Sequence, residues 1–295
     1  MKPRELYEWI EENHGESSIM ICCAVLGVRR EGYYDWLSRP TQAERDAQLV
    51  STLSKIREKH PDYGTQSMID ELPPELKCSY GKGYRICRDN GLLTKRRKPR
   101  SLTKPDPEAQ KSEDLVNRDF TSDKPGTKWF TDITEFACQD GKTYLCGILD
   151  GFDSGLLGFS MENHMRAELC TSALMNAVNR YGKEIDCIIH SDRGSQFTSN
   201  LFRGVLENQG FRQSMGRTGV CFDNAKMESF FATLKNELIY KLPTSQMTRE
   251  QVRLEVFSWI EGYYNRNRRH TTNENKKPPL VKRAEYIQNI VQTTA

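Results

Sequence analysis

Apolar positions in the second half of the chain follow two periods, one of two residues and one close to 3.6. Alternating aromatic and β-branched residues predict strands, and apolar residues three and four apart predict helices. The predicted strands are 128–138, 143–152, 155–161, 184–190 and 211–215. The predicted helices are 165–182, 199–210, 223–238 and 248–268. Three antiparallel strands followed by strands alternating with helices predict an α/β core with a mixed five-stranded sheet.

The first half of the chain has the helical period. Residues 1–40 outline two helices around a turn near Gly27, as in a helix-turn-helix, although a small helical bundle without a DNA role gives the same pattern. The next residues predict a second helical unit, broken at Pro73 and Pro74. The expected domains are a helix-turn-helix-like unit at 1–40, a small helical DNA-binding unit with a basic arm at 43–100, a linker at 101–124, the α/β core at 125–245 and a helical extension at 246–295.

Charge is distributed unevenly along the 295 residues, although the net charge is only +3. Residues 81–104 contain nine Lys or Arg and a single acidic residue. The centre of this run, KRRKPR, begins with Lys95, Arg96, Arg97 and Lys98. Such a run is either a solvated segment or an arm that neutralises DNA phosphates.

The apolar content argues against a membrane protein. The longest apolar run, 19–28, is far shorter than the roughly 20 residues that span a bilayer, and no signal peptide opens the chain. Nine cysteines without a CxxC pair are typical of free, reduced thiols. We therefore expect a bacterial cytoplasmic protein that shares its compartment with the chromosome.

Candidate chemistry begins in the stretch CIIHSDRGSQFTS at 187–199. Asp192 follows a buried strand, at the end of the strand where open α/β sheets keep their sites; a simple strand-to-helix turn explains the same residues. Asp132 lies inside the first predicted strand, where a carboxylate is costly to bury unless it is paired or binds a cation, or else faces solvent on an edge strand.

A third acid, Glu228, lies in the predicted helix 223–238, and 35 residues separate it from Asp192. Asn224 and Lys235 lie on the same helical face. Asn224 either caps the helix or orders a metal-bound water or a terminal base, and Lys235 either meets a DNA phosphate or is solvated. Three acids together repel one another and raise at least one pKa, so the trio implies a bound cation.

The blocks WFTDIT, HSDRGSQFTS and DNAKMESFFATLKNEL resemble the three catalytic blocks of DDE transposases and retroviral integrases. More narrowly, the chain resembles second-reading-frame (OrfB) transposases of insertion-sequence family three, through VRREGYYDWLSR, DYGTQSMIDEL, RDNGL and YYNRNRRH. One departure is Gly155, which stands where arginine is common in that family.

The resemblance implies an RNase H-like core that nicks the ends of an insertion sequence and joins the freed 3′-OH to DNA. Asp132, Asp192 and Glu228 are the expected catalytic residues and metal ligands for two Mg²⁺ ions, with Mn²⁺ as a substitute. The expected partners are double-stranded DNA (terminal inverted repeats and target), a second copy of the chain or a larger synaptic oligomer, and the upstream-frame OrfA product. The expected DNA contacts, besides the basic arm, are Asn224, Lys235, Arg266, Arg268 and Arg269.

Two other functions fit parts of the sequence. A DNA-binding regulator of transposition with an inactive core would use the N-terminal helices alone. A glycoside hydrolase would use Asp192 and Glu228 as acid and base, but the basic arm disfavours it.

Overall fold

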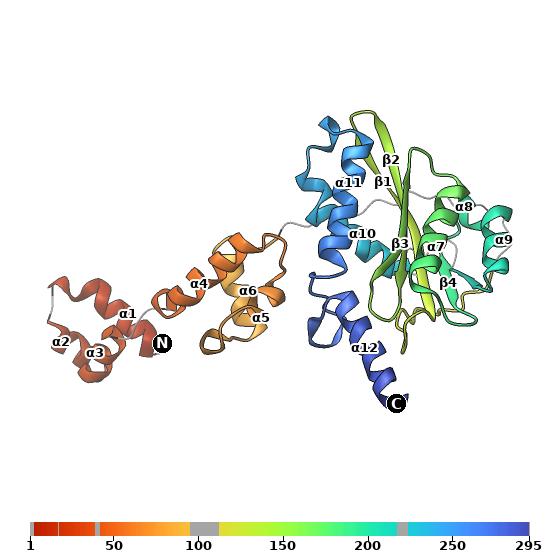
Figure 1. Cartoon of the computed structure of the whole chain (residues 1–295). Coiled ribbons are helices and arrows are strands. Elements are labelled where there is room, and N and C mark those ends of the chain that lie inside the picture. Colours follow the sequence, from red (N-terminus) through yellow and green to blue (C-terminus); the bar gives the residue numbers. More distant parts are fainter. Residues whose placement is uncertain (1–2, 17, 39–41, 95–111, 217–223, 295) are drawn as a thin grey trace. The chain divides into compact units, whose positions relative to one another are not determined.

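The computed structural model describes residues 3–16, 18–38, 42–94, 112–216 and 224–294, which fall into two compact units, Met1–Lys95 and Arg96–Ala295 (Figure 1). No helix in these ranges is both long and apolar enough to cross a membrane. The predicted sites Lys95, Arg96, Arg97 and Lys98 lie outside the described residues.

The N-terminal unit is entirely helical in its described part. Its first core, formed by Ile10, Cys22, Cys23 and Tyr33, joins three helices, and Gly27 turns the chain between the last two with a positive φ of 68°. These helices are α1 (Pro3–Asn13), α2 (Ile19–Leu26) and α3 (Arg30–Ser38), with a 3-10 turn at His14–Glu16.

A separate core in the same unit is built from Leu, Ile and Met side chains such as Leu53, Met68 and Ile86. It joins α4 (Gln42–Lys59), α5 (Thr65–Asp70) and α6 (Tyr80–Asp89), with a 3-10 turn at Pro74–Leu76. The helix breaks predicted at Pro73 and Pro74 lie between α5 and α6. Both N-terminal segments are therefore small helical bundles with their own apolar cores.

The second unit confirms the predicted α/β core with its mixed five-stranded sheet. The sheet order is β3-β2-β1-β4-β5; β1, β2 and β3 are antiparallel, and β4 and β5 run parallel to β1. The strands are β1 (Lys128–Cys138), β2 (Gly141–Asp150), β3 (Leu156–Glu162), β4 (Ile188–Ser191) and β5 (Arg212–Met215). The first strand thus lies at the centre of the sheet, beside the fourth, which excludes the edge-strand explanation of Asp132.

Helices cover both faces of this sheet (Figure 1). On one face, Trp129 and Ile133 pack against α7 (Ala167–Tyr181) and α9 (Asn200–Asn208), next to the short α8 (Ser195–Thr198). On the other, Phe130 and Phe136 pack against α10 (Ala225–Glu237) and α11 (Arg249–Ser258). Odd and even positions of β1 therefore face different helix layers, as strand alternation requires.

Part of the expected linker belongs to this core. Within 112–124, Val116 is buried and Leu115 N donates to Ser214 Oγ on β5 (2.9 Å). Phe120 packs against Phe130 with the ring centroids 5.8 Å apart. Apolar contacts with distant strands, rather than local periodicity, order this segment, and for that reason its sequence resembles a linker.

The C-terminal segment also departs from its predicted form. The single helix expected at 248–268 is α11 followed by a π-helical turn at Trp259–Tyr264, and α12 (Pro279–Thr294) comes after it. Short 3-10 turns occupy Ile239–Lys241, Thr244–Gln246 and Glu274–Lys276. The wider π turn is consistent with packing demands, because Trp259, Ile260 and Tyr264 are all buried in the core.

A buried ion cluster fastens α12 to the turn after β2. Arg283 Nη2 lies 2.8 Å from Asp150 Oδ2, and Arg283 Nε lies 2.7 Å from Asp153 Oδ2. Gly126 N also donates to Asp150 Oδ2. In this turn Gly155 stands close to the cluster, since an added Cβ would lie 3.0 Å from Asp153 Oδ1 and 3.3 Å from Pro279 Cβ.

Candidate active site

Asp132 and Asp192 are placed by the pairing of β1 with β4. The parallel register aligns Phe130 with His190, where the pairing of the two strands ends. Asp132 lies two positions beyond Phe130 on β1, so alternation gives it the same face as Phe130, and Asp192 lies two positions beyond His190, directly after β4 ends at Ser191. Neighbouring strands lie about 4.8 Å apart, so the two carboxylates are close neighbours on the face covered by α10.

Glu228 comes to this face on α10. Asp132 is in register with Gly147 of β2, and a Cβ at Gly147 would lie 3.4 Å from Met227 Cε and 4.0 Å from Phe230 Cε1. The missing side chain at Gly147 thus lets the first turns of α10 lie directly on the strands beside Asp132. Met227 and Phe230 are buried there, and Glu228 is half-buried between them in the sequence.

Asn224 connects the start of α10 to the strand that carries Asp132. Asn224 Nδ2 donates to Thr131 O at 3.0 Å, and both groups are buried. The Asn224 side chain makes no capping bond to α10, which excludes the simple cap role in this structure. Its Oδ1 is buried without a partner among the described residues, a state that costs about 1–3 kcal/mol unless another donor completes it.

The pKa of Asp132 is raised well above its usual range. Burial is the first cause, and the negative charges of Asp192 and Glu228 add to it, while Lys235 and the Ile133 N–H oppose it. Burial also raises the pKa of Glu228 and lowers that of Lys235, whose charge Asp132 and Glu135 favour. The sequence prediction that crowding raises at least one carboxylate pKa is therefore met at Asp132.

The three carboxylates interact without forming a closed metal site. Within the part of the chain that the structure describes, no three Asp, Glu, His or Cys groups are placed closely enough to hold an ion together. The donors nevertheless fit a hard divalent cation, because all three are carboxylates and their mutual repulsion is only partly offset by Lys235.

The loop after β4 holds Asp192 by backbone bonds. Asp192 Oδ1 accepts from Gly194 N at 2.9 Å, and Arg193 Nε donates to Gly216 O at 2.7 Å. His190 is almost fully buried, with Nδ1 2.8 Å from Ser214 Oγ on β5. His190 is thus a core histidine that joins β4 to β5.

The predicted DNA-contact arginines of the C-terminal segment differ in their surroundings. Arg268 binds Glu237 through Nε and Nη2, at 2.9 Å to Oε2 and 2.6 Å to Oε1, and lies over the ring of Tyr264. Arg266 is exposed and donates from Nε to Glu261 O at 3.0 Å. Arg269 is half-buried. Of these, Arg268 has its charge matched within the protein.

The sequence carries no signal for the role of Thr131 and an ambiguous signal for Asp150. Thr131 takes part through its backbone carbonyl, which no residue type reveals. By its place in the sequence Asp150 could approach the site, but it is in register with Trp129, three residues along β1 from Asp132. Its carboxylate forms an ion pair with Arg283. Asp150 is therefore a structural acid.

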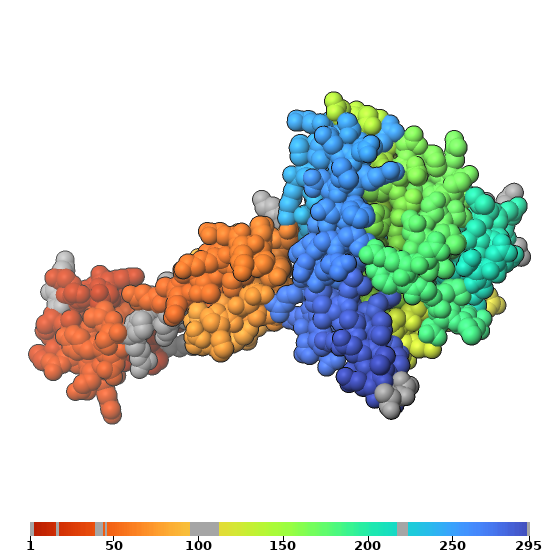
Figure 2. Space-filling view, in the orientation of Figure 1, coloured from red at the N-terminus to blue at the C-terminus, as the bar shows by residue number. Residues whose placement is uncertain are grey.

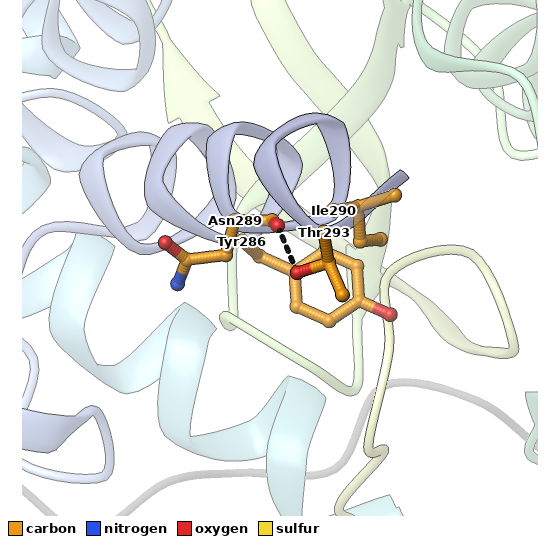
Figure 3. A pocket seen from close by; sticks show the side chains of 4 residues that line it. All are labelled: Tyr286, Asn289, Ile290 and Thr293. Carbon is orange, nitrogen blue, oxygen red and sulfur yellow. Dashed lines mark hydrogen bonds between the residues drawn. The ribbon is translucent and has the colours of Figure 1, made fainter. Parts of the chain in front are cut away.

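A separate hollow of about 290 Å³ lies along α12, lined by Tyr286, Asn289, Ile290 and Thr293 (Figure 3). Thr293 Oγ1 donates to Asn289 O within the helix. The second half of α12 lies at the surface of the core unit, with Ile287, Ile290 and Val291 exposed (Figure 2). With no carboxylate in its lining, this hollow is unrelated to the cluster at Asp132.

Sequence comparisons relate the core to known domains. A family model described as an integrase core domain matches residues 122–221, and a second model with that description matches residues 209–278. The transposase InsF for insertion sequence IS3A of Escherichia coli (strain K12) is 32% identical over 280 residues, which cover 90% of this chain and 94% of the relative. An uncharacterized 31 kDa protein of insertion element IS600 from Shigella sonnei is 33% identical over 272 residues, covering 90% and 98%.

Solved structures give more distant matches. A simian T-cell lymphotropic virus intasome in complex with a PP2A regulatory subunit matches at a TM-score of 0.46 and 15% identity, over 78% of this chain and 74% of that chain. The HTLV-2 integrase catalytic core domain in complex with magnesium matches at 0.42 and 17% identity, over 55% of this chain and 99% of that chain.

Proposed function

This chain belongs to the IS3 family of insertion-sequence transposases, and we propose that it cuts DNA at insertion-sequence ends and joins the freed 3′-OH to target DNA with Asp132, Asp192 and Glu228 as its catalytic residues. The substrate is double-stranded DNA that carries the terminal inverted repeats. A dimer or larger synaptic oligomer would bring two ends together, and the upstream-frame OrfA product is a further proposed partner.

The observation that supports this proposal best is that Asp132 on β1 lies close enough to Asp192, directly after β4, and to Glu228 on α10 for both of their charges to raise its pKa. Each acid alone has an ordinary structural explanation. The approach of Asp192 and Glu228 to Asp132 does not, because folding gains nothing from bringing like charges together in a partly buried place.

In the proposed site the three carboxylates would hold two Mg²⁺ ions, with Mn²⁺ as a substitute. When bound, a pair of such ions activates the attacking oxygen and stabilises the charge that develops on the leaving oxygen. Asp132, between the other two acids, would be the shared ligand. The Gly194 N–H holds one oxygen of Asp192, which orients its carboxylate toward the site.

Lys235 supplies positive charge at the same face. Its ammonium group is half-buried and is favoured by the charge of Asp132. In this position it would bind a non-bridging oxygen of the DNA phosphate beside the scissile bond. Substrate binding would then be weakened more than chemistry by its removal.

A nicking assay on labelled insertion-sequence ends tests the proposal, with Mg²⁺ or Mn²⁺ present. Asp192→Asn is expected to reduce nicking and strand transfer by at least about 10³-fold while duplex binding stays within about twofold of wild type. Asp186→Asn is the matched control, since Asp186 is exposed beyond the site and its positive φ of 58° suits asparagine. This control is expected to nick normally.

The outcomes separate the proposal from its rival. A wild-type protein that binds these ends but nicks them with neither metal contradicts the proposal and favours a DNA-binding regulator. Equal nicking by wild type and Asp192→Asn moves the chemistry away from this cluster. Hydrolysis of glycosides without added metal would instead indicate two-carboxylate acid and base catalysis.

A further inference from the structure

One hydrogen bond joins the two segments that carry acids of the proposed site. Asn224 Nδ2 donates to Thr131 O, across 93 positions of sequence. Thr131 is the residue before Asp132, and Asn224 lies one helical turn before Glu228. The bond therefore connects the backbone next to Asp132 to the helical turn that precedes Glu228.

The pairing of the strands leaves this carbonyl open to a side chain. The β1–β4 ladder stops at Phe130 and His190, one residue before Thr131. Asn224 donates to the Thr131 carbonyl just beyond the end of the β1–β4 ladder. A buried carbonyl needs a donor, so the amide must present its NH₂ group here and keep Oδ1 on its other side.

Apolar packing cannot set the position of Glu228 alone. Met227 and Phe230 hold α10 on the sheet, but contacts between apolar side chains are not directional. A hydrogen bond is directional, and it fixes how far the first turn of α10 is rotated and shifted relative to β1. Since Asn224 makes no capping bond, helix initiation does not explain its burial.

We infer that Asn224 is a positioning residue, which sets Glu228 against Asp132 so that the carboxylates can share divalent ions. The inference rests on the proposed function and deepens it. The unpartnered Oδ1 fits this role, because it leaves a buried acceptor next to the acids for a donor that the described chain does not provide. Asn224 acts through the geometry of Glu228, so its loss changes metal binding first.

The test compares metal binding in the full chain without DNA. Isothermal titration calorimetry with Mn²⁺ is expected to show about 10-fold weaker binding for Asn224→Leu, which has similar volume but no donor. The Mn²⁺ concentration for half-maximal nicking should rise by the same factor, and saturating Mn²⁺ should restore most of the rate. Asn224→Ala, which removes the bond without adding bulk, is expected to behave alike.

Asn236→Leu is the matched control, because Asn236 lies in the same helix, three turns beyond Asn224. It should bind Mn²⁺ as wild type does. Unchanged Mn²⁺ affinity in folded Asn224→Leu and Asn224→Ala overturns the inference, even where nicking falls. A wild-type protein that binds no Mn²⁺ contradicts the proposed function itself, and the positioning role falls with it.

Discussion

Asp132 on β1 and Asp192, directly after β4, each lie two residues beyond the Phe130–His190 pair of the β1–β4 ladder. The register of β1 sets the face of Asp132, because a slip by one residue would turn its carboxylate to the opposite face of the sheet. Asp132 is thus held within a strand, and Asp192 by the first residues of the loop that follows β4.

The raised pKa of Asp132 gives a test of its cation requirement. Its folded pKa lies above the unfolded value of about 3.9, so metal-free stability falls as the pH rises from about 4 through the raised pKa and stays reduced above it. Asp132→Asn removes this penalty and should raise the melting temperature at pH 7.5 in EDTA by roughly 2–4 °C.

Added Mn²⁺ should reverse the order of the melting temperatures, so that wild type melts at a higher temperature than Asp132→Asn. Wild type gains stability because the ion binds only the folded state, whereas Asp132→Asn gains little. Differential scanning fluorimetry with and without 5 mM Mn²⁺, on the order of a saturating dose, measures both effects. Equal Mn²⁺ shifts in the two proteins would show that the ion binds elsewhere.

Arg283 is expected to be essential for the stability of the core unit. Arg283→Met leaves Asp150 and Asp153 buried without their cation, which should cost about 3–5 kcal/mol of unfolding free energy in urea denaturation. The exposed Arg266→Met serves as the control and should change stability by less than about 0.5 kcal/mol. A loss at Arg283 no larger than at the control contradicts the buried-cluster interpretation.

Replacing Arg268 should lower the stability of the protein, whereas replacing Arg266 should weaken DNA binding. Arg268→Ala strands the buried Glu237 carboxylate and should destabilise the protein by about 1–3 kcal/mol. Arg266→Ala should leave the melting temperature unchanged, weaken duplex binding and reduce the slope of log affinity against log salt by about 1. Salt-titrated fluorescence anisotropy checks both variants, and identical salt slopes for Arg266→Ala and wild type would remove Arg266 from the DNA contacts.

Two glycines should respond oppositely to alanine. At Gly158 on β3 an added Cβ would lie 2.4 Å from Ala177 N and 2.5 Å from Ala173 O of α7, so Gly158→Ala should cost about 1–3 kcal/mol. Gly204 in α9 has no atom within 4 Å of such a Cβ, so Gly204→Ala should stabilise by about 0.5–1 kcal/mol. Chemical denaturation of both variants measures the contrast; equal effects would contradict the tight packing of α7 on β3.

The sheet was predictable because its strands carry local signals. The alternation in KWFTDITEFAC and the Asp-Gly turn after it define β1 and its hairpin, and both are confirmed. The family assignment is confirmed as well, by relatives that cover most of the chain. The sequence left open whether β1 is a central or an edge strand, and the strand order shows that it is central.

Long-range contacts account for what the sequence did not reveal. Residues 112–124 have no period because β5 and Phe130 order them. The predicted helix 248–268 changes to a π turn at Trp259 because tertiary packing decides its geometry. The hydrogen bond from Asn224 is accepted by the backbone carbonyl of Thr131. Every residue has such a carbonyl, so the sequence could not identify this partner. The assignment of the three acids and of the DNA contacts stays a prediction until the variants are measured.

The buried ion cluster of Arg283 with Asp150 and Asp153 also affects how the chain folds during its synthesis. The two residues are 130 positions apart, so a growing polypeptide on the ribosome exposes the acidic turn long before its cation is synthesised. Contacts this distant in sequence close late in folding. A chain that ends before Arg283 would therefore leave the carboxylates of Asp150 and Asp153 without the cation that neutralises them.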